Sequence, residues 1–448
     1  MKIEEKTSEK SSFMNSTSVQ LGLIVLLVLL LMIPLEYVKY LTYERQEREK
    51  EVMQEMADKW GGEVVVYGPI LNIPYKKYVK SKRKNEEGNY ETVTTTETHQ
   101  AYFLPNQLKM HSKVKASNKN RGIYEAVVYK SDLNFSGDFK VPDFASMKIK
   151  TEDVLWSEAK LIVKTSSLKS IRDEMKIKFE NKNYTFQPIY VGGHNKLKSL
   201  QSKEINLTEV IKKQKNLNFK MDLSYNGSQA LQMLPIGKTS TFSMESNWKD
   251  PSFSGEYLPM DKTVSEKGFK ANWKILDFNR PFPQSFLGGL PNFDEYTFGV
   301  NFINTIDQYQ QNERSSKYGL LVIGLTFLTF FMIQVVNKLK IHIIEYTMIG
   351  AAMVLFYTLL LSITEHLSFS TAYLISASAV IILVSLYSYS LLKQKKLLFF
   401  VAATMSLLYA YIYVIIQMEN YALLSGSVGL FIILSIIMYF SRKIDWQK

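Results

Sequence analysis

The chain has 448 residues and no cysteine, which excludes disulfides, thiolate metal sites and cysteine nucleophiles. A net charge of +12 could suggest a nucleic-acid partner, but the basic residues are scattered among acidic ones and form no stripe with interleaved aromatics. We therefore expect no nucleic acid to be bound. The hydrophobic content of 46% averages an apolar C-terminal third and a long polar segment from about Glu36 to Lys317.

The N-terminal region predicts a membrane anchor. Residues 1–18 contain scattered lysines and are expected to form a cytoplasmic tail. Val19–Leu35 is a run of Leu, Val and Ile long enough for a first transmembrane helix. A cleaved signal peptide would end in a small-residue cleavage site, and this run ends in Ile33-Pro34-Leu35-Glu36-Tyr37. An uncleaved signal anchor is therefore favoured.

A juxtamembrane helix is predicted over Glu36–Trp60. Its charges alternate in sign at helical spacing, as in Glu44 and Arg48. Gly61-Gly62 is expected to end it. We interpret the segment as a stalk that continues the membrane helix and packs on the following domain, in preference to a helix that binds a partner.

Residues 61–317 predict a large β-rich, sandwich-like extracytoplasmic domain. The hydrophobic period changes there from about 3.6 to 2. The apolar positions that alternate with polar ones are Leu108, Met110, Val114, Ala116, Ile177, Phe179, Leu217, Phe219, Met221, Leu223, Tyr225, Phe269, Ala271, Trp273 and Ile275. Turn residues separate the strands at Glu87-Gly88-Asn89, Asn181-Lys182-Asn183 and Asn226-Gly227. Many half-buried strands imply a sandwich or an open barrel, with one short helix near Leu207–Gln214.

A short internal similarity occurs in this domain. Asp132–Gly137 and Asp222–Gly227 share the pattern Asp-Leu-polar-aromatic-x-Gly. The pattern suggests a duplicated β unit, although six residues cannot establish one.

Residues 318–440 predict five further membrane spans. Five apolar runs contain no Lys, Arg, Asp or Glu, and each approaches the ~20 residues that a helix needs to cross ~30 Å of hydrocarbon. They are Tyr318–Val336, Tyr346–Thr364, Thr371–Leu392, Leu397–Met418 and Tyr421–Phe440. Because a bilayer offers no water to satisfy backbone groups, helices are expected. With the first span, the fold is predicted to be a six-helix transmembrane bundle.

The short loops between these runs predict the orientation. Lys and Arg mark cytoplasmic loops, and here they occur at Lys338, Lys340, Lys393, Lys395, Lys396, Arg442, Lys443 and Lys448. The alternate loops, Glu365–Ser370 and Glu419-Asn420, contain none. Both termini, including the tail 441–448, are therefore expected in the cytoplasm and the large domain outside. The lysines of that domain do not conflict with this, because long domains translocate regardless of charge.

We find no signature of catalysis, of a cofactor or of a metal site: no nucleophile elbow, P-loop, H-E-x-x-H or dinucleotide fingerprint. Two pairs at span ends were weighed as proton or metal sites, His342 with Glu345 and Glu365 with His366. Ionisable groups on a transport path normally lie within the spans. We interpret both pairs as polar residues that mark helix ends, and we assign no catalytic, cofactor-binding or metal-binding residue.

Several long segments resemble one family of bacterial membrane proteins. The matching segments are Gly68–Tyr75, Arg121–Phe139, Leu234–Pro259, Gly268–Gln284, Ile341–Phe369 and Glu419–Trp446. In this order they resemble the CreD family, inner-membrane proteins associated with cell-envelope integrity. The resemblance implies a bacterial plasma-membrane protein linked to envelope stress, and it supplies no catalytic residues. The chain departs from the family at its N-terminal tail and at Lys76–Thr96, a Lys/Glu/Thr-rich stretch expected to form a hairpin.

Three functions are compatible with these features. The leading hypothesis is a non-enzymatic inner-membrane protein that supports envelope integrity and stress tolerance. Its outer domain would contact an envelope component or another membrane protein, and its helices the lipid bilayer. The first alternative is a transporter or lipid-handling protein, and the second a membrane-anchored hydrolase. The sequence implies no particular oligomeric state.

Overall fold

The computed structural model describes residues 17–84, 90–189, 198–213, 216–302, 308–418 and 421–441. The chain divides into two compact units. The helical unit comprises residues 1–50 and 306–448, and the β unit comprises residues 51–305. Several sequence expectations lie outside the described residues: the tail up to residue 16, the turn 87–89, the loop 419–420 and the basic tail 442–448.

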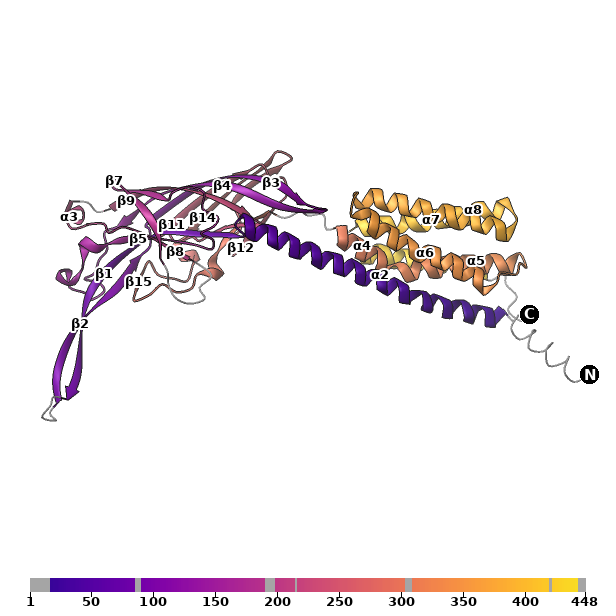
Figure 1. Cartoon of the computed structure of the whole chain (residues 1–448), viewed down its shortest axis with the longest axis horizontal. Coiled ribbons are helices and arrows are strands. Elements are labelled where there is room, and N and C mark those ends of the chain that lie inside the picture. Colours follow the sequence, from indigo (N-terminus) through magenta and orange to yellow (C-terminus); the bar gives the residue numbers. More distant parts are fainter. Residues whose placement is uncertain are drawn as a thin grey trace, which may run out of the picture. The chain divides into compact units, whose positions relative to one another are not determined.

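The β unit is built almost entirely of strands (Figure 1). Its strands are β1 (Val64–Lys84), β2 (Tyr90–Phe103), β3 (Gln107–Arg121), β4 (Tyr124–Lys140), β5 (Lys160–Thr165), β6 (Lys176–Phe179), β7 (Lys182–Ile189), β8 (Lys198–Ser202), β9 (Asn216–Ser228), β10 (Ala230–Met233), β11 (Thr239–Ser246), β12 (Pro251–Gly255), β13 (Asp261–Ser265), β14 (Gly268–Leu276), β15 (Ser285–Leu287) and β16 (Phe298–Phe302). Its short helices are η1 (Thr151–Asp153), η2 (Trp156–Glu158), α3 (Val210–Lys213), η3 (Asp277–Asn279) and η4 (Asp294–Tyr296). The short helix predicted from residue 207 is therefore present as α3.

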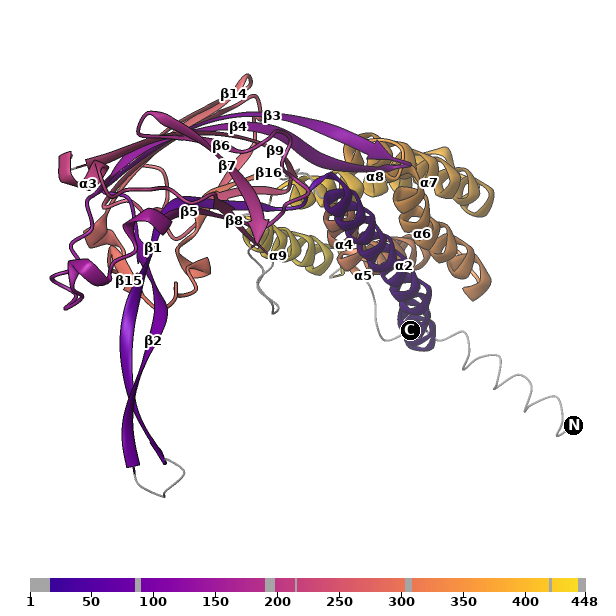
Figure 2. The same ribbon diagram turned by 60° about the vertical axis from the view of Figure 1, so that its left-hand side comes forward.

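The strands form one sheet of 16 strands that folds back on itself. Their order is β12-β16-β10-β1-β5-β8-β7-β6-β9-β4-β3-β11-β14-β13, and β2 pairs with β1 and β15. The first half-sheet runs from β12 to β8 and the second from β6 to β13. Strand β7 joins them, because its first residues pair with β6 and its last with β8. Figure 2 shows the two half-sheets as facing layers.

The core lies between the two half-sheets, where the predicted period-2 positions point. Every alternating residue named from the sequence is buried. Aromatic rings from β16 fill the centre: Phe298 lies 5.5 Å from the ring of Trp273, and Phe302 lies 5.0 Å from that of Tyr129. The Tyr129 hydroxyl also donates a 2.5 Å hydrogen bond to the carbonyl of Ala230. Each buried Phe contributes roughly 1.5–3 kcal/mol by leaving water, so these rings hold the halves together.

The two similar segments, 132–137 and 222–227, lie on neighbouring antiparallel strands, β4 and β9. Leu133 faces Leu223 directly in the register. The polar positions hydrogen-bond across the pair, since the amide of Asn134 donates to Asp222 over 2.6 Å. The similarity thus reflects two strands that satisfy each other's polar groups.

The last turns of α2 (Thr17–Trp60) pack on the β unit, within residues 51–305. Glu55 pairs with Arg121 at 2.6 Å, and the indole of Trp60 donates to the Tyr129 carbonyl at 3.4 Å. The helix ends as predicted, because the amides of Gly61 and Gly62 both bond the carbonyl of Ala57. The predicted span and the juxtamembrane helix are one continuous helix.

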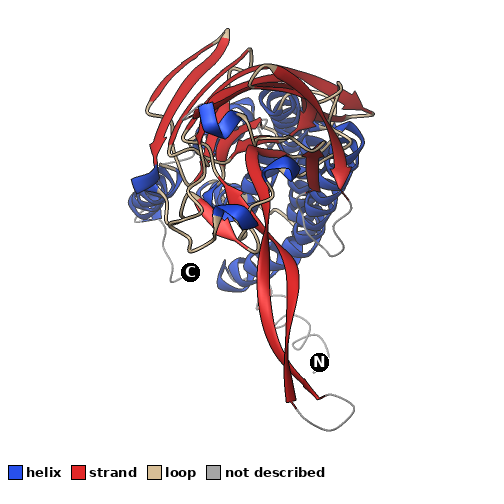
Figure 3. Cartoon of the chain, turned by 90° about the vertical axis from the view of Figure 1, so that its left-hand side faces the viewer, coloured by secondary structure: helices blue, strands red, loops and turns tan. Residues whose placement is uncertain are grey.

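Strands β1 and β2 extend beyond the sheet as a two-stranded ribbon (Figure 3). The pairing runs without interruption from Leu71 opposite Phe103 to Lys84 opposite Tyr90. The hairpin expected over Lys76–Thr96 is therefore confirmed in its described part.

The helical unit contains the apolar helices. Its helices are α2, α4 (Gln308–Lys317), α5 (Gly319–Val336), α6 (Ile343–Thr364), α7 (Phe369–Leu392), α8 (Lys395–Gln417) and α9 (Ala422–Ser441). Among the described residues, α2, α5, α6, α7 and α8 are long and apolar enough to cross a membrane. The predicted ends of the last four agree with the structure to within three residues. The sixth predicted span corresponds to α9, whose apolar stretch, Leu424–Ser435, is shorter.

Helix α2 packs on α5 and α6 through glycines. A Cβ placed on Gly350 would lie 2.2 Å from a methyl of Leu31, and one on Gly319 would lie 2.2 Å from a methyl of Leu35. Small residues allow such close approach between membrane helices. A polar link accompanies this packing, because Gln334 donates to the side chain of Gln20 over 2.6 Å.

The boundary of the β domain differs from the predicted residue 317. Gln308–Lys317 is helix α4 and belongs to the helical unit. Its polar composition suggested the outer domain, but the structure buries Asn312, whose amide donates to Thr364 of α6 over 2.8 Å. This buried side-chain hydrogen bond, which a hydropathy pattern does not indicate, therefore holds α4 against α6.

We expect Gly137→Ala to destabilise the β unit by roughly 1–3 kcal/mol, as overpacking does. The new Cβ would lie 1.9 Å from the carbonyl oxygen of Gln107 on the paired strand, and that backbone atom cannot move without breaking the pairing. Thermal unfolding of the purified full-length protein, followed by tryptophan fluorescence, measures this, since four of the five tryptophans belong to the β unit. Gly289→Ala is the control, because nothing lies within 4 Å of its Cβ. Equal melting temperatures for the two variants would contradict this account.

Candidate functional site

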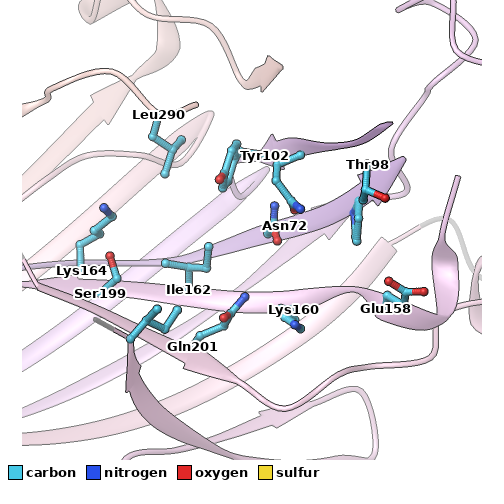
Figure 4. Close-up of a pocket in the computed structure, with 13 residues that line it drawn as sticks. Asn72, Thr98, Tyr102, Glu158, Lys160, Ile162, Lys164, Ser199, Gln201 and Leu290 are labelled. Atoms are coloured by element: carbon cyan, nitrogen blue, oxygen red, sulfur yellow. The ribbon is translucent and has the colours of Figure 1, made fainter. Parts of the chain in front are cut away.

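A polar pocket of about 460 Å³ lies on the β unit (Figure 4). Its lining residues are Asn72, Pro74, Thr98, Gln100, Tyr102, Glu158, Lys160, Ile162, Lys164, Ile189, Ser199, Gln201 and Leu290. Most come from β1, β2, β5 and β8, which are neighbours in the first half-sheet. The pocket is thus formed by a curved sheet face and covered at one side by the loop after β15.

Strand alternation decides which residues reach the pocket. On β1, Leu71 and Ile73 are fully buried in the core, while Asn72 between them lines the pocket. Successive side chains of a strand point to opposite faces. The pocket is therefore on the opposite face of β1 from Leu71 and Ile73.

Residues from distant parts of the chain meet through the register. Asn72 stands opposite Tyr102 on one side and Lys160 on the other. One step along the sheet, Ile162 stands opposite Gln201 of β8. Directly opposite residues lie close enough for their side chains to interact, so these residues form one continuous lining.

The pocket carries two ammonium groups in different surroundings. Lys160 pairs with Glu204 at 3.4 Å. Lys164 is half-buried opposite Ser199, and burial lowers the pKa of its ammonium from the usual 10.5. With the amides of Gln100 and Gln201, the lining offers hydrogen-bond donors and acceptors together with positive charge.

The amide of Asn72 helps to fix the floor of the pocket. It is 4% exposed, and its Nδ2 donates to the carbonyl of Ala101 on β2 over 3.3 Å. A side chain held in this way keeps a defined position toward a ligand.

His342 and Glu345, which the sequence led us to interpret as marking a helix end, lie at the start of α6. The carboxylate of Glu345 accepts a 2.7 Å hydrogen bond from the backbone amide of His342, and the amide of Glu345 donates back to the His342 carbonyl. These bonds satisfy backbone groups at the helix start.

The second predicted pair separates in the structure. Glu365 follows the last residue of α6 and pairs with Arg45 of α2, with 3.3 Å between Oε1 and Nε. His366 is exposed. The neighbouring side chains thus point to different surroundings, and the partner Arg45 was not expected from the sequence.

No group of three or more His, Asp or Glu side chains within the described ranges is arranged to hold a metal ion. The pocket lining contains a single carboxylate, that of Glu158.

The pocket residues were not predicted from the sequence, although one signal for them exists. In Lys160–Thr165 the two lysines are four positions apart on a strand, so Lys160 and Lys164 share one face of β5 with Ile162 between them. That pattern indicates a half-buried strand, but the neighbours of its polar face follow only from the strand order.

We expect Lys164→Met to raise the melting temperature near neutral pH by removing a half-buried charge while retaining the apolar stem. The free energy of unfolding should increase by a few tenths to about 1 kcal/mol, because water partly screens this half-buried charge. Since the folded-state pKa lies below the unfolded value, the penalty is full below the folded pKa and disappears as pH rises toward 10.5. The gain should therefore shrink with rising pH in melting curves.

Lys109→Met, at an exposed position on β3, is the matched control and should leave the melting temperature nearly unchanged. A Lys164→Met protein that melts at a lower temperature than the wild type at pH 7 would refute this expectation.

Comparison with known proteins identifies the family. The sequence profile of the family described as "Inner membrane protein CreD" matches residues 16–447. The Escherichia coli (strain K12) inner membrane protein CreD is 27% identical over 402 residues, which cover 88% of this chain and 86% of that protein. The match extends over both the apolar helices and the β unit. The chain therefore belongs to the CreD family of inner membrane proteins.

Proposed function

We propose that the protein supports cell-envelope integrity and stress tolerance without catalysing a reaction. The helical unit anchors the chain in the inner membrane, and the β unit contacts a component of the envelope through its polar pocket. The observation that carries this proposal is the pocket itself. It joins two lysines, several amides and a tyrosine on one face of a rigid sheet.

The character of the helical unit supports an anchor over a transporter. Among its described residues, the buried polar side chains are hydroxyls and amides, and none is an Asp, Glu, Lys or Arg. Transport paths for ions and protons normally contain ionisable groups within the spans.

The chemistry of the pocket supports binding over hydrolysis. Glycoside hydrolases, for example, place two carboxylates across the bond that they cleave. The pocket lining has Glu158 alone, together with amides, hydroxyls and ammonium groups that hold a ligand by hydrogen bonds and charge.

For the topology we propose six spans, with α9 as the sixth, both termini in the cytoplasm and the β unit outside. The lysines at 338 and 340 and those at 393, 395 and 396 support this arrangement. The first three lie in the α5–α6 and α7–α8 connections, and Lys395 and Lys396 are the first residues of α8. All five positions share one side if each helix crosses.

Single cysteines test the orientation against a background without cysteine. We expect Gln394→Cys to be shielded from an impermeant thiol reagent in intact spheroplasts, and Ser368→Cys to be labelled. Gly289→Cys in the β unit should be labelled as well, and lysis should expose Gln394→Cys. The opposite pattern at the two loop positions would overturn the topology.

The function is tested in a strain that lacks the protein and is complemented with variants. We expect the pocket variant Lys160→Gln/Lys164→Gln to accumulate normally but to reduce tolerance of an envelope-damaging agent to near that of the deletion strain. The matched control is Glu365→Gln/His366→Gln, which also changes two polar residues but belongs to the helical unit and should retain most of the tolerance.

Two results would contradict this proposal. Full tolerance in the pocket variant would show that the pocket is not the working surface. A complete loss of tolerance in a correctly inserted Glu365/His366 variant would move the function to the membrane unit.

A further inference from the structure

The ribbon formed by β1 and β2 has two chemically different faces. Because side chains alternate along each strand, Lys77 and Arg83 point to one face. The register places Glu97 opposite Lys77 and Glu91 opposite Arg83, so acidic residues accompany the basic residues of this paired face.

The other face is basic. Lys76, Lys80 and Lys82 lie on it, and the register places threonines opposite all three. From residue 90 to residue 98, the residues of β2 on this face are Tyr90, Thr92, Thr94, Thr96 and Thr98, which supply hydroxyls and no carboxylate. We call the three lysines with their opposing threonines the lysine face.

One contact fixes the base of the lysine face to the sheet. Tyr78, which lies between two of the lysines in the alternation, donates its hydroxyl to the carboxylate of Asp153 in η1 over 2.9 Å. The segment between η1 and η2 also bonds to β1, since the amide of Leu155 donates to the Pro74 carbonyl. These contacts hold the ribbon where it leaves the sheet.

The lysine face continues the floor of the pocket. By the same alternation, Asn72 and Pro74 precede Lys76 on one face of β1, and Thr98 leads to Gln100 and Tyr102 on β2. The right-handed twist of a two-stranded ribbon turns this face gradually along its length. The pocket and the lysine face therefore form one polar surface with lysines at both ends.

We propose that this surface binds an extended anionic polysaccharide, a glycan that carries carboxylate or phosphate groups. The inference rests on the function proposed above and names the class of envelope component. The amides and the tyrosine of the pocket suit sugar hydroxyls and rings, and the lysines of the pocket and the ribbon suit the acidic groups.

The dimensions favour a polymer. Residues 76–83 of β1 extend about 26 Å beyond the pocket at ~3.3 Å per residue, which exceeds the size of a monosaccharide or a small anion. A flexible charged chain laid along the ribbon could meet the successive lysines in turn.

The composition of the lysine face disfavours two other polyanions. Single-stranded nucleic acid is bound by successive aromatic side chains on which bases stack. The described ribbon residues 76–84 and 90–98 contain two aromatic rings, Tyr78, whose hydroxyl is bonded to Asp153, and Tyr90 at the far end of the pairing. Binding to a lipid surface uses an apolar face that enters the headgroup region. Threonines and lysines provide none.

Binding measurements with the full-length protein test the proposal. The protein is placed in nanodiscs of phosphatidylcholine and titrated with alginate oligomers, with phosphorylated dextran and with unmodified dextran of equal length. Liposomes of phosphatidylglycerol form a separate arm. Two variants carry equal losses of charge: Lys80→Gln/Lys82→Gln on the lysine face and Lys77→Gln/Arg83→Gln on the paired face.

We expect the wild type to bind alginate or phosphorylated dextran and not unmodified dextran. The lysine-face variant should bind the charged glycan on the order of tenfold more weakly, a few-fold for each exposed ion pair lost. For this variant, the slope of log K against log salt concentration should become shallower by roughly 1.4. Each of the two lost lysines would account for about 0.7, by analogy with counterion release from single-stranded nucleic acid. The paired-face variant should stay within about twofold of the wild type.

Equal weakening in the two variants would overturn the proposal, because net charge and not the face would then control binding. Equal binding of unmodified dextran, or binding of the phosphatidylglycerol liposomes alone, would overturn it as well. These results are independent of the tolerance assay. Loss of tolerance in the pocket variant with no glycan binding would leave the proposed function standing and refute only the ligand class.

Discussion

The alternation of side chains along β1 is the constraint on which the β unit depends. Leu71 and Ile73 enter the core, while Asn72 between them faces the pocket. A register shift of one residue would exchange these faces, placing an amide in the core and two large apolar side chains in the pocket. The same strand pairs with β2, β5 and β10, so core, pocket and ribbon share one register.

Closure of the folded sheet sets the curvature of the pocket face. Phe298 and Phe302 of β16 insert among rings of the second half-sheet, which draws the two halves together. The first half-sheet can then leave its other face to polar residues, because its apolar positions are satisfied on the inside. Lys164 illustrates the consequence: it remains half-buried on this face, and burial lowers the pKa of its ammonium group.

The spans and most strands could be predicted from the sequence because each has its own hydrophobic period. The pocket could not, since Asn72 and Lys160 are 88 positions apart and become neighbours only through strand order. The ion pair between Arg45 and Glu365 could not be predicted either, because its two residues are distant in the sequence and meet only in the folded chain. Helix α4 was assigned to the wrong unit because its burial depends on Asn312, a hydrogen-bonding side chain that hydropathy counts as exposed.

The ribbon shows how charge along a chain differs from charge in space. In the sequence, the basic residues of β1 and the glutamates of β2 form a mixed, nearly featureless segment, and on that ground no binding stripe was expected. The register separates these charges. Glu97 and Glu91 stand opposite Lys77 and Arg83, whereas a threonine stands opposite Lys80. Two strands with period 2 thus gather lysines on one face with no carboxylate opposite them in the register. The absence of a basic run in a sequence therefore excludes a contiguous helical or disordered stripe, but not a cationic β surface.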